Sequence, residues 1–190
     1  QYWLGRVYFA QKKYEEAFLN FYQAEVLLKD HEDLYAPMAR LYSRLGNYER
    51  AEMYVDSALT LYGTDPELLL LKGDLAERRS GSEESYQYFE RANFHQPDDI
   101  EIESKLGAAL YNLGRNEESM VLFRRILSKN SKHPFANFMI ATLFVEGNNV
   151  RTATRYLNQA GLSAYENFAP ALMLWGKLGY ASSAYQRTVE

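Results

Sequence analysis

The stretch YAPMARLYSRLGNYERAEMYVDSAL, residues 35–59, carries two helical patterns with a turn between them. Apolar side chains recur at helical spacing on both sides of the turn, at Tyr35, Met38, Leu41 and Tyr42 and then at Ala51, Tyr54, Val55, Ala58 and Leu59. Gly46 suits the left-handed backbone conformation that ends a helix, and Asn47 can start the next one. The stretch therefore predicts two amphipathic helices joined by a tight turn.

The same arrangement returns along the chain at a fixed period of about 34 residues. Four series of positions share this period: Gly5, Ala39, Gly73, Gly107 and Ala141; Ala17, Ala51, Ser85, Ser119 and Ala153; Ala24, Ala58, Ala92, Ile126 and Ala160; and the larger Phe21, Val55, Phe89, Phe123 and Leu157. Small residues at fixed positions let two helices approach to about 8–10 Å. Such a period is typical of stacked helix pairs, each of which buries its apolar face only against its neighbours.

Residues that start or end helices lie between the apolar segments. Gly81, Gly114 and Gly147 fall near the position that corresponds to Gly46, so we expect the equivalent turns there. Proline lies at or just before a helix start in three places: Asp65-Pro66, Gln96-Pro97-Asp98-Asp99 and His133-Pro134.

These motifs resemble the tetratricopeptide repeat family, whose 34-residue unit carries Leu-Gly, an aromatic residue, Gly-x-Tyr-x-x-Ala and then an aromatic residue, Ala and Pro. The first two units match best, through Leu4-Gly5, Tyr8, Tyr14, Ala17, Phe21 and Ala24 and through Tyr35, Tyr42, Gly46, Tyr48, Ala51 and Ala58. Lys72 departs from the pattern, because Leu is usual there, and its stem could snorkel the ammonium to solvent. Over about residues 1–167 the resemblance implies an all-α, right-handed superhelical solenoid whose concave groove is lined by the first helix of each unit.

The period divides the chain into one array of repeats. The units span about residues 1–31, 32–65, 66–99, 100–133 and 134–167, followed by a partial unit at 168–190. We expect ten helices and a partial final pair, with a turn at Gly179 and Tyr180, slightly early for the period. Since the first unit starts within its first helix and the last stops within its second, we expect the array to belong to a longer chain.

Composition narrows the classes of partner and compartment. The net charge is −4 and Lys and Arg do not cluster, which disfavours a surface for nucleic acid, so an RNA-binding helical repeat is the weakest alternative. No apolar run approaches the length of roughly 18 residues that indicates a membrane span, so none is predicted. The absence of Cys fits the cytoplasm and the bacterial periplasm equally well, and localisation and oligomeric state stay open.

The sequence lacks motifs that carry chemistry. His31, His95 and His133 have no metal-binding spacing, and the chain contains neither a glycine-rich phosphate loop nor a Gly-x-Ser-x-Gly motif. The acidic run 98–103 lacks the glycine of a calcium loop and suits a helix N-terminus, and residues 80–85 suit a turn followed by a helix start. We therefore expect no catalytic residue, metal or cofactor, and a chain that is not an enzyme.

The resemblance instead directs attention to the concave groove. Carried over by period, the partner-binding candidates are Arg6, Arg40, Arg44, Arg78, Tyr111, Asn112, Phe135 and Phe138. Arg can grip carboxylates with two hydrogen bonds, while Tyr and Phe provide large contact areas at low entropic cost. A partner with an apolar anchor and an acidic portion would match this set.

One subfamily, which clamps the acidic tails of chaperones with Lys, Asn, Asn, Lys and Arg, can be tested directly. The matching positions hold Tyr2, Arg6, Pro37, Glu67 and Leu71, or one unit later Ala36, Arg40, Leu71, Glu101 and Lys105, so no clamp can form. The sequence predicts a scaffold that binds a protein or peptide segment and organises an assembly. The alternative is the regulatory or substrate-recruiting part of a larger enzyme.

Overall fold

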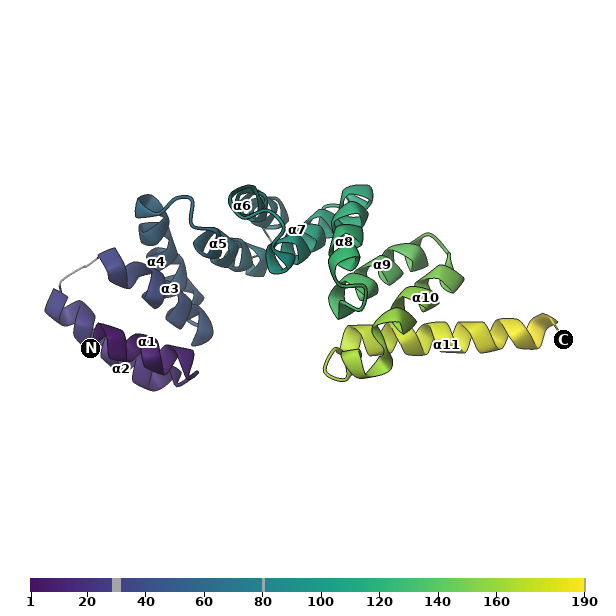
Figure 1. Ribbon diagram of the computed structural model, residues 1–190, viewed down its shortest axis with the longest axis horizontal. Helices are drawn as coiled ribbons and strands as arrows, with labels where there is room; N and C mark the ends of the chain where they lie inside the picture. The colour runs from purple at the N-terminus through teal and green to yellow at the C-terminus, as the bar shows by residue number, and fades with distance from the viewer. Residues whose placement is uncertain (29–31, 80, 190) are drawn as a thin grey trace. The chain divides into compact units, whose positions relative to one another are not determined.

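The structure, a computed structural model, describes residues 1–28, 32–79 and 81–189, with the side chains of 28, 162 and 180–189 left out. All regular structure in these segments is helical, with eleven α-helices and two 3-10 helices and no strand (Figure 1). The predicted all-α fold is confirmed. The chain forms two compact units, Gln1–Pro97 and Asp98–Glu190, and each is described separately.

The N-terminal unit consists of three successive helix pairs. They are α1 (Tyr2–Ala10) with α2 (Tyr14–Leu28), α3 (Tyr35–Arg44) with α4 (Tyr48–Leu61), and α5 (Pro66–Arg78) with α6 (Ser82–His95), and the 3-10 helix η1 (Glu32–Leu34) precedes α3. Each first helix packs mainly against the second helix of its own pair, and α2 and α4 also contact the first helix of the next pair. The core of this unit therefore runs through all three pairs.

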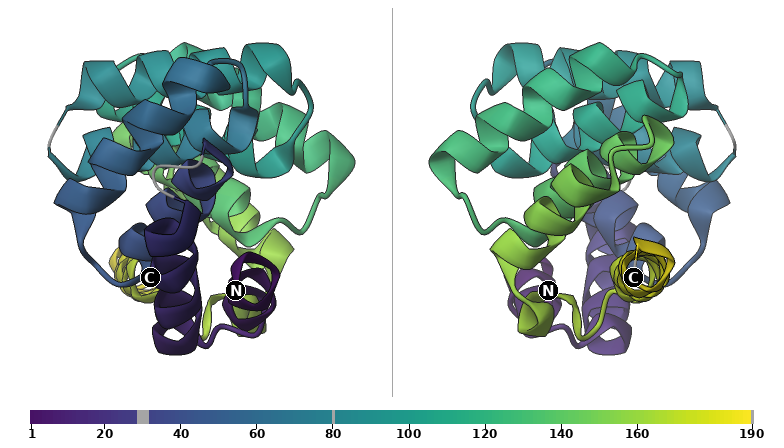
Figure 2. Two further views of the ribbon diagram at one scale, coloured as in Figure 1. Left: turned by 90° about the vertical axis from the view of Figure 1, so that its left-hand side faces the viewer. Right: turned by 90° about the vertical axis from the view of Figure 1, so that its right-hand side faces the viewer.

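The C-terminal unit contains two further pairs and a long last helix. The pairs are α7 (Ile100–Asn112) with α8 (Asn116–Lys129) and α9 (Pro134–Glu146) with α10 (Val150–Ala160), followed by the 3-10 helix η2 (Leu162–Tyr165) and by α11 (Ala169–Val189). Figure 2 shows the helix pairs in two opposite views. The starts of α5, α7 and α9, at Pro66, Ile100 and Pro134, keep the period of the sequence.

The α3–α4, α7–α8 and α9–α10 turns each place one left-handed residue directly before the N-cap of the second helix. Gly46 and Gly114 take this conformation with φ of +77° and +75°, as predicted. The turn predicted near Gly147 is present, but its left-handed residue is Asn148, with φ +57°, while Gly147 has φ −80°. Asn tolerates this conformation better than most residues do, so the turn needs no glycine there. Gly81 is instead the N-cap of α6, with φ −84°.

Side chains cap the helix starts where the sequence has Asp or Asn. Asp65 Oδ1 accepts hydrogen bonds from the amides of Glu67 and Leu68 at 2.9 and 3.1 Å. Asp99 Oδ1 accepts the equivalent pair from residues 101 and 102 at 2.8 and 3.1 Å. These caps satisfy amides that lack a partner within the helix, so the acidic run 98–103 acts partly as a helix start.

Each helix pair is held by a small residue facing a larger one sixteen positions later. A Cβ on Gly5 would lie 2.6 Å from Phe21 Cδ1, and a Cβ on Gly107 would lie 2.9 Å from Phe123 Cζ. The small-residue series therefore marks close helix crossings, as predicted. Where the series has Ala instead of Gly, the corresponding larger residue is not Phe, and the pairs are Ala39 with Val55 and Ala141 with Leu157.

Lys72 is buried in α5, with only 4% of its surface exposed. Its Nζ lies 2.7 Å from Asp56 Oδ1 and 2.9 Å from Glu52 Oε1, both on α4. The prediction that Lys72 extends its ammonium to solvent is wrong, because two carboxylates one helical turn apart neutralise it inside the unit. Burial lowers the pKa of Lys72, but the hydrogen bonds that it donates to Asp56 and Glu52, together with their charges, raise the pKa overall.

The predicted turn at Gly179 is wrong, because α11 runs without a break from Ala169 to Val189. A single glycine inside a helix costs only about 1 kcal/mol relative to Ala, and the Ala- and Leu-rich stretch before Gly179 favours a continuous helix. The last repeat therefore has one long helix in place of a partial pair. Trp175 on this helix packs edge-on against Tyr165, with ring centres 6.0 Å apart.

Candidate functional site

Four of the eight predicted binding residues are arginines of the N-terminal unit. They occupy two rows that follow the period, Arg6 with Arg40 and, one helical turn later, Arg44 with Arg78. Arg44 is exposed, and none of the described residues forms an ion pair or ring contact with it. Arg40 Nη2 lies 2.6 Å from Glu67 Oε2, and both side chains are partly exposed, so water or a ligand can compete for this ion pair.

The other two arginines stack on aromatic rings. The guanidinium of Arg6 lies 5.0 Å from the ring centre of Trp3, and that of Arg78 lies 4.5 Å from the ring centre of Tyr48. Stacking fixes the plane of a guanidinium and leaves its edge N–H groups free to donate. The first helices of this unit thus present several oriented cationic groups.

The remaining four predicted residues belong to the C-terminal unit. Asn112 is exposed at the end of α7, whereas Tyr111 is half-buried and its hydroxyl donates to Glu146 of α9. This hydrogen bond, together with burial and the nearby carboxylate charge, raises the pKa of Tyr111 to about 12. The contact joins the ends of two successive first helices.

Phe135 and Phe138 of α9 are brought together by Phe168, a residue outside the predicted set. Phe138 meets the Phe168 ring edge-on at 4.8 Å between ring centres, and Phe135 lies 6.2 Å from it. Both side chains are half-buried rather than exposed. They therefore hold the α10–α11 connection against α9 and offer only part of their surface to a partner.

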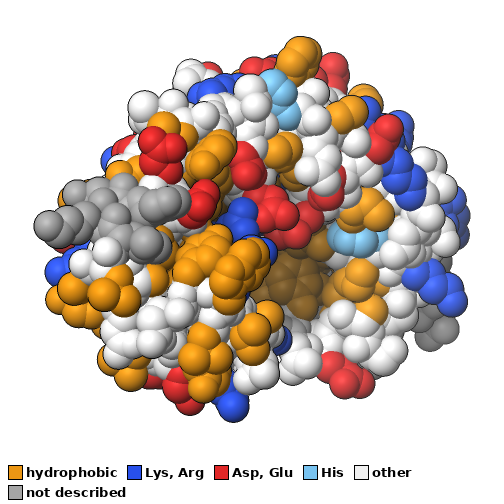
Figure 3. All heavy atoms as spheres, turned by 60° about the vertical axis from the view of Figure 1, so that its left-hand side comes forward, with side chains coloured by type: hydrophobic (Ala, Val, Ile, Leu, Met, Phe, Trp, Pro, Cys, Tyr) orange, Lys and Arg blue, Asp and Glu red, His pale blue; other side chains and the backbone are white. Residues whose placement is uncertain are grey.

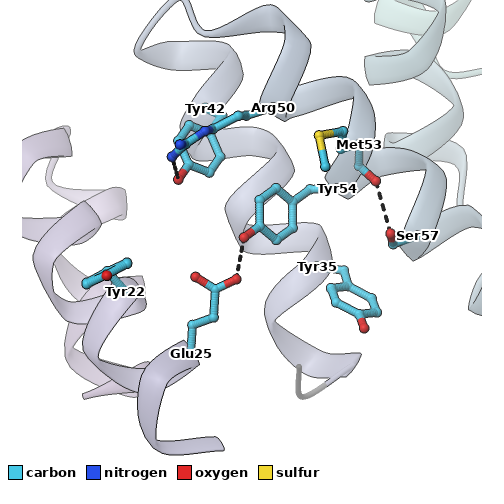
Figure 4. Close-up of a pocket in the computed structure, with 8 residues that line it drawn as sticks. All are labelled: Tyr22, Glu25, Tyr35, Tyr42, Arg50, Met53, Tyr54 and Ser57. Carbon is cyan, nitrogen blue, oxygen red and sulfur yellow. Dashed lines mark hydrogen bonds between the residues drawn. The ribbon is translucent and has the colours of Figure 1, made fainter. Parts of the chain in front are cut away.

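The N-terminal unit also contains a pocket of about 460 Å³ that the sequence did not predict. Residues of three helices line it: Tyr22 and Glu25 of α2, Tyr35 and Tyr42 of α3, and Arg50, Met53, Tyr54 and Ser57 of α4 (Figure 4). Since α2 and α4 are the second helices of their pairs, this pocket does not belong to the predicted surface of first helices.

Hydrogen bonds and stacked rings give the pocket a fixed shape. The Tyr42 and Tyr54 rings stack with centres 5.5 Å apart. Arg50 Nη1 donates to the Tyr42 hydroxyl at 3.0 Å, and the Tyr54 hydroxyl donates to Glu25 (Figure 4). Burial and the bond to Glu25 raise the pKa of Tyr54 well above its usual range, so this tyrosine stays protonated as a donor.

One signal in the sequence could have indicated the pocket. Tyr22 lies on the outer side of a second helix, where the corresponding residues of the later units are all polar: Asp56, Glu90, Arg124 and Asn158. An aromatic residue at a position that is otherwise polar suggests a local role. The remaining lining could not be read from spacing alone, because it depends on how three helices face one another.

The buried charged residues have structural partners. Like Lys72, Glu103 of α7 is fully buried, and its Oε1 lies 2.8 Å from Arg125 Nε and 3.4 Å from Lys129 Nζ, both on α8. Burial lowers the pKa of His133, whose Nδ1 accepts the Ala136 amide at 3.2 Å as a helix cap. These groups hold helices together or start them.

The parts of the chain that the structure describes carry no metal-binding cluster. They contain no group of three or more His, Cys, Asp or Glu side chains arranged to hold a metal ion, and His31 lies outside them. None of their helices combines the length and apolar character needed to cross a bilayer.

Comparison with known proteins identifies the repeat. A family model described as tetratricopeptide repeat matches residues 32–75, while no curated protein sequence matches the chain. The structure of PilW, described as a widely conserved type IV pilus biogenesis factor, is similar with a TM-score of 0.79 at 20% identity, covering 97% of this chain and 86% of that one.

Two further solved structures share the fold. Pseudomonas aeruginosa PilF has a TM-score of 0.78 at 18% identity, covering 96% of this chain and 83% of its own. YrrB, described as a TPR protein with an unusual peptide-binding site, has a TM-score of 0.72 at 18% identity, covering 89% and 87%. Residues 32–75 therefore match a tetratricopeptide repeat, and the chain shares the all-α helical-repeat fold of these solved structures.

Proposed function

We infer that the chain is a protein-interaction scaffold, without catalytic activity of its own, that organises an assembly. It holds a segment of another protein on the face formed by the first helices of its repeats. The descriptions of two similar structures support this class of function, since one names a peptide-binding site and the other a pilus biogenesis factor.

The arginines of the N-terminal unit are the observation that carries the proposal. Arg44 is exposed, Arg40 takes part only in a partly exposed ion pair, and Arg6 and Arg78 are oriented by aromatic rings. Four cations on successive first helices favour a partner segment with carboxylates, and each guanidinium can bind a carboxylate with two hydrogen bonds. The C-terminal unit would add polar contacts from Asn112 and from the exposed part of Tyr111. It would add apolar contacts from the exposed parts of Phe135 and Phe138.

A library of labelled acidic peptides that each contain one large apolar residue tests this proposal by fluorescence anisotropy. We expect binding that weakens with added salt, because the charges involved are near the surface. The double variant Arg44→Glu/Arg78→Glu should weaken it at least about tenfold, chiefly through slower association. Arg151→Glu, an exposed arginine on the second helix α10, is the matched control and should bind like the unchanged protein.

An amide hydrogen-exchange footprint of the complex gives an independent answer. Protection along α3 and α5 supports the proposal. Protection confined to the second helices, with affinity unaffected by the double variant, contradicts it.

A further inference from the structure

The outer face of α2 is more apolar than its position in the repeat requires. Leu19, Tyr22 and Val26 follow one another at helical spacing and are 58%, 51% and 59% exposed. Contiguous exposed apolar side chains in a chain that also has abundant charged residues mark contact surfaces. Figure 3 brings the N-terminal end of the chain forward and shows hydrophobic side chains on its surface beside charged ones.

This apolar face adjoins the tyrosine pocket, the cavity lined by Tyr22, Glu25, Tyr35, Tyr42, Arg50, Met53, Tyr54 and Ser57. Tyr22 belongs to both, and Met53, which is 68% exposed, forms the opposite rim on α4. The pocket therefore continues as an open apolar strip, which suits an extended segment better than a compact ligand.

Arg50 gives the pocket hydrogen-bond donors that its neighbours do not use. Arg50 has five N–H donors and uses one for Tyr42. The Glu25 carboxylate accepts a hydrogen bond from the Tyr54 hydroxyl. A matching ligand has carbonyl groups that can accept from Arg50 and flat apolar surfaces that stack on tyrosine rings.

An extended segment rich in proline has this chemistry. Proline lacks a backbone N–H, and its polyproline II conformation exposes the carbonyl groups without internal hydrogen bonds. Aromatic-lined grooves recognise such segments at low entropic cost because their conformation is already formed. We propose that the tyrosine pocket and the adjoining face of α2 bind a proline-rich extended segment of a partner protein, at a second site separate from the first-helix surface.

Fluorescence anisotropy of a labelled peptide made of repeated Pro-Pro-Leu triplets tests the proposal. The unchanged protein should bind this peptide, and Tyr22→Ala and Arg50→Gln should each weaken binding at least about tenfold. Tyr22→Leu keeps an apolar side chain without the stacking ring and should weaken binding as well. Circular dichroism then separates a lost contact from a lost fold.

Two controls keep this site distinct from the first-helix surface. Phe94→Ala removes an aromatic side chain of α6 that is 79% exposed and lies outside the pocket, and it should leave peptide affinity unchanged. Arg44→Glu/Arg78→Glu should also leave it unchanged, so either proposal can fail without the other.

Three outcomes overturn the proposal. One is no binding up to about 1 mM peptide. Another is equal affinity of the folded Tyr22→Ala and Arg50→Gln variants and the unchanged protein. The third is equal or tighter binding of a peptide with every Pro replaced by Ala, which points to a helical partner segment.

Discussion

The ring of Phe89 occupies the space into which any side chain at Gly73 would project. Gly73 lies in the middle of α5 and Phe89 in the middle of α6, and both are fully or almost fully buried. The two residues fix how closely this helix pair packs. Glycine is required here for its lack of volume, since the backbone is helical.

Gly73→Ala should therefore destabilise the protein, although alanine is the better helix former. We expect a loss of about 1–3 kcal/mol in the free energy of unfolding, because the added methyl group forces the Phe89 ring or the helices apart. Gly176→Ala in α11, where nothing lies within 4 Å of the added Cβ, is the matched control and should stabilise by up to about 1 kcal/mol. Urea denaturation followed by circular dichroism measures both.

The double variant Gly73→Ala/Phe89→Val recreates the combination found at Ala39 and Val55. If the two positions compensate in volume, the double variant should lose less stability than the sum of the single variants, with a coupling energy of about 0.5–3 kcal/mol. Strict additivity would show that the two side chains do not limit each other.

Removing the two carboxylates beside Lys72 should destabilise the protein more than removing the lysine itself. Glu52→Gln/Asp56→Asn leaves a buried ammonium group without its neutralising carboxylates and should cost about 3–5 kcal/mol. Lys72→Met replaces the ammonium by an apolar side chain of similar length, while the carboxylates stay partly exposed and Glu52 keeps Arg79, so it should cost less than about 1.5 kcal/mol. A reversed order in the urea midpoints would mean that Lys72 is not buried in solution.

Tyr165→Phe should raise stability. The Tyr165 side chain is fully buried against aromatic residues, and its hydroxyl has no hydrogen-bond partner among the described residues. A buried polar group without a partner costs about 1–3 kcal/mol, so removing the oxygen should recover part of this amount. A drop of the unfolding midpoint instead would reveal a partner for the hydroxyl.

Stability should fall in alkaline solution. Burial raises the pKa of Tyr165 to about 12, and the hydrogen bond to Glu146, with burial and its charge, raises that of Tyr111 to about 12. A tyrosine whose pKa is raised in the folded state contributes stability to the fold. This contribution is complete below the tyrosine pKa of the unfolded state, about 10, and is lost as the pH rises toward 12. Urea midpoints measured across this range should decline, and less so in Tyr165→Phe.

The period of about 34 residues was enough to predict the fold, because every helix pair needs a small residue at the same crossing. Counting from Gly46 in steps of one period also leads to Gly114 and to Asn148, the left-handed residues of their turns. The turn predicted near Gly147 lies where expected, and the count places its left-handed residue one position later. Gly179 misled as a turn signal, because one glycine cannot end a helix whose other residues favour it.

The candidate site was less accessible to sequence reasoning. Period placed Arg40, Arg44 and Arg78 on first helices, where the structure has them, and their role in binding stays a prediction. It could not show that Phe168 half-buries Phe135 and Phe138, because this contact comes from an irregular segment outside the period. Contacts between segments, like the lining of the tyrosine pocket, depend on helix rotation and side-chain conformation.

The buried Lys72 has a consequence for how such arrays can be rearranged. The corresponding residues of the other repeats are Leu4, Met38, Leu106 and Ile140, all uncharged, so the third repeat alone has a cation at this position. Its partners, Glu52 and Asp56, belong to the second repeat. If the third repeat followed any repeat other than the second, Lys72 would be buried without Glu52 and Asp56 to neutralise it. The second and third repeats therefore have to stay adjacent, in this order, for Lys72 to keep its carboxylate partners.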